Sequence, residues 1–126
     1  MQSFKSAEPL ANEISRVVIS GSNDKAAVFM ATGSQIRGVT KRGKDFFKLD
    51  TSHTERILHL HVQGTNLWSA GPYTLNSYAS ANNVIADKYY LCCEDKINQM
   101  IVHTHPMIGM VTILACNDSA IKVIDD

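Results

Sequence analysis

The sequence predicts an all-β fold, and three observations lead to that expectation. Helical periodicity is nearly absent, and apolar residues alternate with polar ones over short runs. Segments that carry glycine, asparagine or aspartate separate those runs at intervals of about ten residues. These residues suit tight hairpin turns, because they tolerate a positive φ or form Asx turns. Short antiparallel strands joined by turns are therefore the expected elements.

The strands can be placed in chain order from these signals. Pro9 and the β-branched run in Arg16–Ser20 disfavour a helix near the N-terminus. The expected strands are Arg16–Ser20, Ala26–Ala31, Gln35–Thr40, Asp45–Leu49, Ile57–Val62, Asn66–Ala70, Tyr73–Tyr78, Asn83–Cys92, Ile97–His103, Met110–Cys116 and Ala120–Ile124. The turns between them are expected at 21–24, 32–34, 41–44, 63–66, 71–72 and 117–119.

A longer regularity groups these strands into units. Apolar strands with a polar lead-in begin near Ile14, Glu55 and Lys96, a period of about 40 residues. Four short antiparallel strands repeating at about 40–45 residues are typical of the blade of a β-propeller. Trp-Asp dipeptides are missing, so the sequence predicts a partial WD40-like β-propeller of about three four-stranded antiparallel blades, the last incomplete. A generic β-sandwich or barrel is the alternative.

The expected boundaries follow from this period. Residues 1–14 are expected to lead in from a preceding blade, and the blades are expected at about 15–54, 55–95 and 96–126. Closed propellers have about four to eight blades. The sequence therefore predicts that this chain is part of a longer protein.

Composition narrows the class of function. Twelve Lys and Arg residues balance 12 Asp and Glu residues, so the net charge of +0 gives no broad attraction for nucleic acid. A hydrophobic content of 44% argues against disorder, and no apolar run reaches the roughly 18 residues of a membrane span. The N-terminus has no apolar signal region, and the 3 cysteines suit reduced thiols in the cytoplasm. The adjacent cysteines Cys92 and Cys93 are expected to be buried strand residues.

Several segments resemble one known family. Residues 34–47 read SQIRGVTKRGKDFF, and residues 51–57 read TSHTERI. Together they resemble a blade of the propeller found in the seventh-subunit family of the BBSome, the Bardet–Biedl syndrome coat complex. The resemblance covers residues from about 14 to 125 and continues through 61–68, 89–98 and 111–118.

The resemblance implies a non-catalytic role without a cofactor. Members of that family are scaffolds of a ciliary coat that supports cilium assembly and the trafficking of membrane proteins. The implied partners are other propeller-bearing BBSome subunits and, through the complex, ciliary membrane-protein cargo. The implied locations are the cytoplasm, the cilium, the ciliary basal body and, peripherally, the ciliary membrane.

Two groups of residues are candidates for an interaction surface. The basic residues Arg37, Lys41, Arg42 and Lys44, with Lys48 beyond them, form either a solvated turn or a contact for an acidic partner or anionic lipid headgroups. Trp68 and Tyr73 flank a Gly-Pro turn and are either interface anchors or packing between blades. Of the adjacent pair Phe46 and Phe47, strand alternation is expected to send only one ring inward.

The histidines raise the question of a metal site. His103-Thr-His105-Pro resembles the zinc-ligand core of JAMM-type isopeptidases, which require a serine and an aspartate further along the chain. Ile113 and Cys116 stand at those positions, so a zinc-dependent hydrolase is kept only as the alternative to a non-catalytic protein. His103 is expected to end its strand and His105 to begin the following loop. His59 and His61 are expected to be partly exposed strand residues, not metal ligands.

Overall fold

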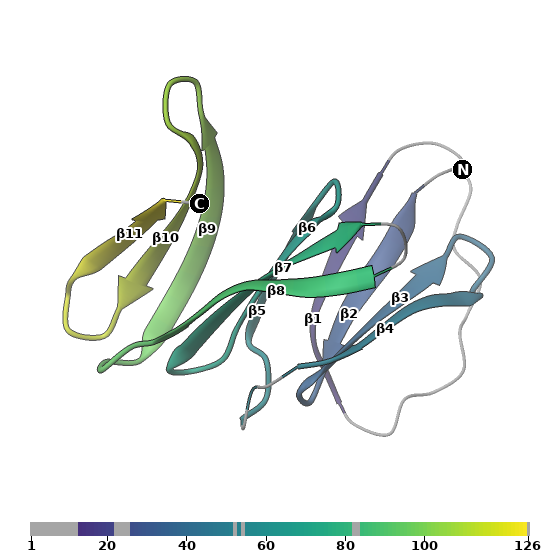
Figure 1. Ribbon diagram of the computed structural model, residues 1–126. Coiled ribbons are helices and arrows are strands. Elements are labelled where there is room, and N and C mark those ends of the chain that lie inside the picture. Colours follow the sequence, from purple (N-terminus) through teal and green to yellow (C-terminus); the bar gives the residue numbers. More distant parts are fainter. Residues whose placement is uncertain (1–12, 22–25, 52, 54, 82–83, 126) are drawn as a thin grey trace, which may run out of the picture.

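The computed structural model describes residues 13–21, 26–51, 53, 55–81 and 84–125, and these residues form strands, turns and connecting segments but no helix. The strands make three antiparallel sheets that stand side by side (Figure 1). The first sheet contains β1 (Ile14–Ser20), β2 (Ala27–Thr32), β3 (Gln35–Thr40) and β4 (Asp45–Asp50). The second contains β5 (His59–Gln63), β6 (Asn66–Ala70), β7 (Thr74–Ala81) and β8 (Val84–Cys92). The third contains β9 (Ile97–His105), β10 (Gly109–Cys116) and β11 (Ile121–Asp125).

Each sheet is an up-and-down meander in which neighbours in sequence are neighbours in space. The strand orders are β1-β2-β3-β4, β5-β6-β7-β8 and β9-β10-β11, so the third sheet has three strands where the other two have four. The sequence-based prediction of an all-β fold with four, four and three strands is confirmed. The expected lead-in segment, residues 1–14, lies outside the described residues as far as residue 12.

The first strands of successive sheets lie against one another. β5 contacts β1 on one side and β9 on the other. The chain enters β5 and β9 in the same way, because the backbone N–H of Ile57 donates to the Gly33 carbonyl (2.8 Å) and that of Ile97 to the Pro72 carbonyl (2.7 Å). Both isoleucines are buried, and both acceptors lie in the turn between the second and third strands of the preceding sheet. The sequence repeat of about 40 residues is therefore matched by equivalent backbone hydrogen bonds at the entry to β5 and to β9.

The hydrophobic core lies between the sheets. One cluster joins the first and second sheets through Phe29, Ile36, Leu60 and other side chains, and another joins the second and third sheets through Leu75, Ile97 and Leu114. The second sheet is therefore covered on both faces, as expected for sheets that bury their apolar faces against neighbours.

The outward-facing sides of the first and third sheets carry exposed apolar side chains. Ile19 on β1 is 67% exposed and Val123 on β11 is 62% exposed. Their neighbours Val18 and Ile124 point the other way and pack against the two core clusters, as strand alternation requires.

Candidate functional site

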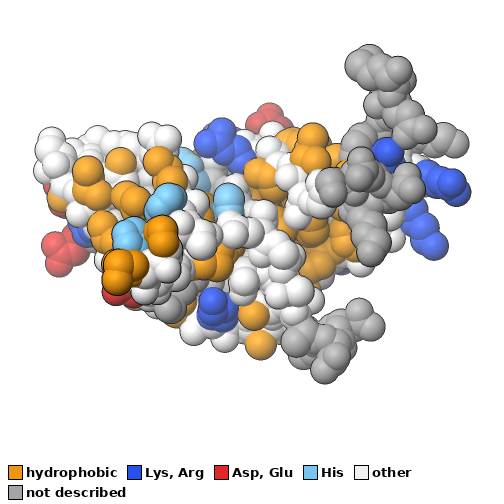
Figure 2. Space-filling model, turned by 90° about the horizontal axis from the view of Figure 1, so that it is seen from above, with side chains coloured by type: hydrophobic (Ala, Val, Ile, Leu, Met, Phe, Trp, Pro, Cys, Tyr) orange, Lys and Arg blue, Asp and Glu red, His pale blue; other side chains and the backbone are white. Residues whose placement is uncertain are grey.

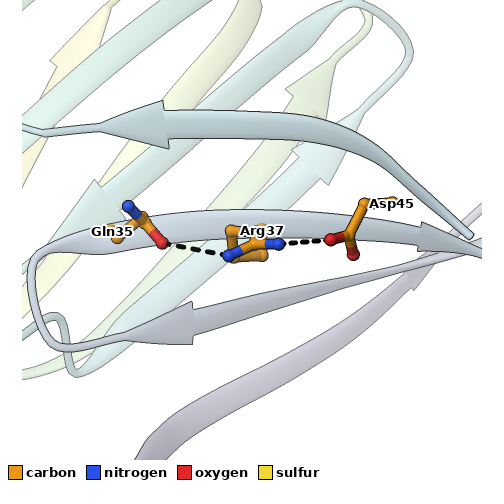
Figure 3. A network of polar contacts seen from close by, with 3 residues as sticks. All are labelled: Gln35, Arg37 and Asp45. Atoms are coloured by element: carbon orange, nitrogen blue, oxygen red, sulfur yellow. Dashed lines mark hydrogen bonds and ion pairs between the residues drawn. The ribbon is translucent and has the colours of Figure 1, made fainter. Parts of the chain in front are cut away.

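The basic segment predicted from the sequence is divided between strand β3, which carries Arg37, and the turn that follows this strand. On β3, the Arg37 guanidinium forms an ion pair with the Asp45 carboxylate and donates to Gln35 Oε1 at 3.5 Å (Figure 3). Gln35 Nε2 in turn donates to Asp50 Oδ1 at 2.7 Å. Arg37 is thus held along the surface of its own sheet, and its charge is largely balanced by Asp45.

The rest of the basic segment forms a hydrogen-bonded turn between β3 and β4. The Gly43 N–H donates to the Thr40 carbonyl and the Thr40 N–H to the Lys44 carbonyl, both at 2.9 Å. Gly43 has a φ of 79°, which a residue with a side chain rarely adopts. Arg42 and Lys44 are exposed, while Lys41 is half-buried. We name residues 41–44 the basic turn.

Phe46 and Phe47 lie on the same side of the sheet, and the prediction that only one ring turns inward is wrong. A β-bulge interrupts the pairing of β3 with β4, because Gly38 opposes Phe47 while Val39 opposes Asp45. The extra residue breaks the alternation of side chains. Both rings pack edge-on against Phe29, with centroid distances of 5.6 Å for Phe46 and 5.4 Å for Phe47.

Gly38 provides the space for this arrangement. A Cβ atom at this position would lie 2.9 Å from the Cβ atom of Phe47 and 3.1 Å from two ring carbons of Phe46. The glycine inside the Ile36–Lys44 segment is therefore explained by packing, because the neighbouring strand β4 approaches this position too closely for a side chain.

Replacing Gly38 by alanine is expected to destabilise the chain by about 1–3 kcal/mol, because the added methyl group overpacks the contact with β4. The free energy of unfolding in urea measures this change. The matched test is a double-mutant cycle with Phe46→Ala, which removes part of the clash, so we expect a coupling of at least about 0.5 kcal/mol. Strictly additive effects of the two substitutions would contradict the role given to Gly38.

An apolar cavity lies beside these rings, between the first and second sheets. Its volume is about 170 Å³, and its lining includes Phe29, Phe46 and Phe47 from the first sheet and Val62, Leu67 and Ile85 from the second. Phe46 is 51% exposed, so its ring forms part of the mouth of the cavity. We name this feature the Phe46 cavity.

The two aromatic candidates beside the Gly-Pro turn have different surroundings. Trp68 is fully buried in β6 and lies 5.5 Å from the His61 ring, measured between centroids. The expectation that it could anchor an exposed interface therefore needs correction, because the second sheet is covered on both faces. Tyr73 is 45% exposed and is available on the surface.

A buried histidine network, which the sequence reasoning missed, lies beneath that turn. His53 Nδ1 is 2.7 Å from Thr74 Oγ1, and His53 Nε2 is 2.8 Å from Ser69 Oγ. His53 thus ties the segment between β4 and β5 to β6 and β7. Burial lowers the pKa of His53 from its ordinary 6.5, although a hydrogen bond with Ser69 opposes the shift. The corresponding segment between β8 and β9 has no histidine, so the repeat offered no signal for it.

Of the other histidines, His61 is a partly exposed strand residue as expected, while His59, His103 and His105 differ from expectation. His59 is buried and not partly exposed, and burial lowers its pKa, while a hydrogen bond to Ile97 opposes the shift and the nearby Arg16 charge adds to it. His105 belongs to β9, which continues past His103, and its Nδ1 accepts from the N–H groups of Met107 and Ile108. Figure 2 shows histidine side chains gathered over one part of the upper face.

These histidines give no support to the zinc alternative. Within the described ranges, no group of three or more His, Cys, Asp or Glu side chains lies together in a way that could hold a metal ion. The His103 and His105 rings are 6.5 Å apart between centroids, and Nδ1 of His105 is engaged with the turn that follows.

The cysteines are free thiols, but only one is buried. Cys116 is buried, Cys93 is half-buried and Cys92 is exposed, so the expectation that Cys92 and Cys93 are both buried is wrong. Burial raises the pKa of the Cys93 thiol, with the nearby Cys116 acting in the same direction.

In the part of the chain that is described, no helix has the length and apolar character needed to cross a bilayer.

This chain is similar to one known protein family and to named proteins from two organisms. A family model described as the BBS7 beta-propeller matches residues 1–126. "BBSome complex member BBS7" from Mus musculus is 35% identical to this chain over 115 residues, which cover 89% of this chain and 16% of the mouse protein. "BBSome complex member bbs-7" from Caenorhabditis elegans is 27% identical over 115 residues, which cover 82% of this chain and 14% of the worm protein.

The chain therefore spans about one-sixth of the length of the mouse relative and about one-seventh of the worm relative. The match to the family model extends over the whole chain, and the all-β structure with its meandering sheets agrees with it. The resemblance stated from the sequence is confirmed: this chain belongs to the BBS7 beta-propeller family.

Proposed function

We propose that this chain is a non-catalytic scaffold and protein-interaction module of a BBSome coat, where it supports cilium assembly and the ciliary trafficking of membrane proteins. The observation that carries the proposal is the match of the whole chain to the BBS7 beta-propeller family, whose two relatives are both named as BBSome complex members. The proposed partners are other BBSome subunits and, through them, membrane-protein cargo. The proposed locations are the cytoplasm, the cilium with its basal body, and the ciliary membrane as a peripheral site.

In this proposal the three sheets are three blades. The proposed boundaries are 15–54, 55–95 and 96–126, with residues 1–14 as a lead-in from a preceding blade. Support comes from the contacts of β5 with β1 and β9, which bring the first strand of each sheet together. The exposed apolar side chains on the outward faces of the first and third sheets are those that further blades would cover.

The β9–β10 hairpin supplies a surface suited to protein contacts. Its tip carries Met107, which is 90% exposed, and Ile108, which is 58% exposed. His105 Nδ1 accepts from both backbone N–H groups, at 3.1 and 3.3 Å, and so orders the tip. Because the backbone of the tip is already ordered, binding through it costs less conformational entropy than binding through a flexible loop.

The proposal is tested by recovering the epitope-tagged full chain from ciliated cells and identifying its partners by mass spectrometry. We expect BBSome subunits to be recovered with it and the chain to be found at cilia. Replacing Met107 and Ile108 together by serine should lower that recovery at least threefold without changing the melting temperature, since both side chains are exposed. The matched control, Tyr90→Ser, alters an exposed side chain on β8 and should leave recovery unchanged.

Two outcomes would overturn the proposal. One is recovery of the chain without any BBSome subunit, in cells where the complex itself is intact. The other is stoichiometric zinc in protein purified without added metal, together with hydrolase activity that is lost on replacing His103 or His105.

A further inference from the structure

The Phe46 cavity has the size and chemistry of a pocket for one apolar side chain. An apolar cavity of roughly 150 Å³ is large enough to hold a benzene molecule, and the volume here is about 170 Å³. None of its described lining residues is charged. Phenylalanine or leucine therefore matches the cavity in volume and polarity.

Only Asp45 separates the basic turn from Phe46, which lines the mouth of this cavity. Lys44 and Arg42 precede Phe46 by two and four residues, and both side chains are exposed. The two backbone hydrogen bonds between Thr40 and residues 43–44 hold the turn, and the Lys44 N–H also donates to Thr40 Oγ1 at 3.2 Å. A ligand would therefore meet charges on an ordered turn, which lowers the entropy lost on binding.

The acidic side chain next to the basic turn in the chain is already paired. Asp45 is engaged by Arg37, which lies on the opposite face of β3 from Ile36 and Gly38. Ile36 belongs to the core cluster between the sheets, and Gly38 contacts the two phenylalanine rings, so their face is the cavity side. On the second-sheet side, the exposed Asp87 of β8 lies opposite the lining residue Tyr78. The positive charge near the cavity is therefore that of the basic turn, on the first-sheet side.

We propose that the Phe46 cavity and the basic turn form a docking site for an acidic segment of another protein. One phenylalanine or leucine side chain of that segment fills the cavity, and neighbouring carboxylates pair with Arg42 and Lys44. Charge complementarity of this kind favours the correct partner and speeds its association. Figure 2 shows hydrophobic side chains gathered on the upper face and several Lys and Arg side chains toward its right-hand end.

The shape of the site favours a protein segment over a lipid surface. A bilayer is penetrated by apolar side chains that project outward, whereas Phe46 and Phe47 both turn back onto Phe29 and leave a hollow. A hollow receives a side chain from its ligand. Binding to a lipid surface is therefore the alternative that the experiment must distinguish from binding to a protein segment.

This inference deepens the proposed scaffold role and rests on it. Binding is measured with the full chain by fluorescence anisotropy, using labelled synthetic peptides as probes. The first probe is an acidic peptide with one central phenylalanine, the second has alanine in its place, and the third keeps the phenylalanine in a basic peptide. Sedimentation with phosphatidylcholine vesicles containing 30% phosphatidylserine tests the lipid surface.

We expect the acidic phenylalanine peptide to bind at least tenfold more tightly than either other peptide, and more weakly as the salt concentration rises. Charge reversal by Arg42→Glu with Lys44→Glu should weaken its binding at least tenfold. Thr65→Trp, which adds bulk at an exposed lining residue of the cavity, should weaken it to the same extent. The control Tyr90→Ala alters a side chain that is 49% exposed, close to the 51% of Phe46, and should have no effect.

Equal binding of the acidic and basic phenylalanine peptides, or no binding of the acidic one at millimolar concentration, would overturn the docking site. Vesicle binding that is lost in the charge-reversal variant, without any peptide binding, would assign the basic turn to lipid instead. If the peptides fail to bind while the same chain is recovered with BBSome subunits, the docking site is wrong and the scaffold role stands. Far-ultraviolet circular dichroism of each variant shows that it is folded before binding is compared.

Discussion

Replacing Trp68 by alanine is expected to destabilise the chain by about 3–5 kcal/mol, the usual cost of removing a fully buried large aromatic side chain. Trp68 is 0% exposed and lies in the second sheet, which is packed on both faces. A loss of this size is a large share of the stability of a small domain, which is about 5–15 kcal/mol. Urea denaturation followed by circular dichroism measures the change.

Two further variants make this result specific. Trp68→Phe should be tolerated better than alanine, because phenylalanine refills much of the space and because the indole Nε1 has no hydrogen-bond partner among the described residues. Tyr73→Ala changes an exposed side chain in the turn between β6 and β7, and it should change the free energy of unfolding by less than about 0.5 kcal/mol. If Trp68→Ala leaves unfolding unchanged but reduces partner recovery, Trp68 is a surface anchor and its assignment to the core is wrong.

The second large effect is expected at His53. Alanine at this position removes the contacts to Ser69 Oγ and Thr74 Oγ1 and leaves the fully buried Ser69 hydroxyl unsatisfied. We expect a loss of about 2–3 kcal/mol, which is typical of a buried polar group that loses its partner. The melting temperature, compared between the two proteins at pH 7.5, gives the measurement.

The same histidine makes stability depend on pH with a definite sign. Burial lowers the pKa of His53 and of His59 below 6.5, so both rings stay neutral in the folded chain where the unfolded chain takes up protons. The contribution of these two histidines to the free energy of unfolding is therefore fully present above pH 6.5. It is lost as the pH falls below 6.5. Each group contributes at most about 1.4 kcal/mol per pH unit.

Melting temperatures at pH 7.5, 6.5 and 5.5 test this dependence. His53→Gln does not titrate in this range, so its melting temperature should fall less between pH 7.5 and 5.5 than that of the unchanged chain. His61→Gln alters a half-buried histidine on the same element as His59 and is the matched control for removing an imidazole. A His53→Gln protein with the same pH dependence as the parent would contradict a neutral, buried His53.

Much of the local structure was predictable because its causes are local. Turn residues mark the ends of the strands, and alternation marks the strands themselves, so each strand expected from the sequence is present in the structure. The repeat of about 40 residues was also readable, since each unit needs a similar apolar strand at its start. The candidate basic turn was found in the same way, from charged residues around a glycine.

Local rules failed where a contact with another sheet or strand decides the outcome. Alternation placed Phe46 and Phe47 on opposite faces, but a bulge opposite Gly38 places both against Phe29. His59 and Trp68 have polar atoms and were compatible with an exposed strand, yet neighbouring sheets cover them.

The all-β class, the repeat and the family can be read from the sequence, because hydrophobic alternation, turn residues and the segment 34–47 are formed by neighbouring residues. Which side chains are buried, where the Phe46 cavity lies and how His53 contacts β6 and β7 depend on packing in three dimensions. Burial and cavities arise between sheets. The residues that face each other there are far apart in the chain, and their packing depends on the relative position of whole sheets.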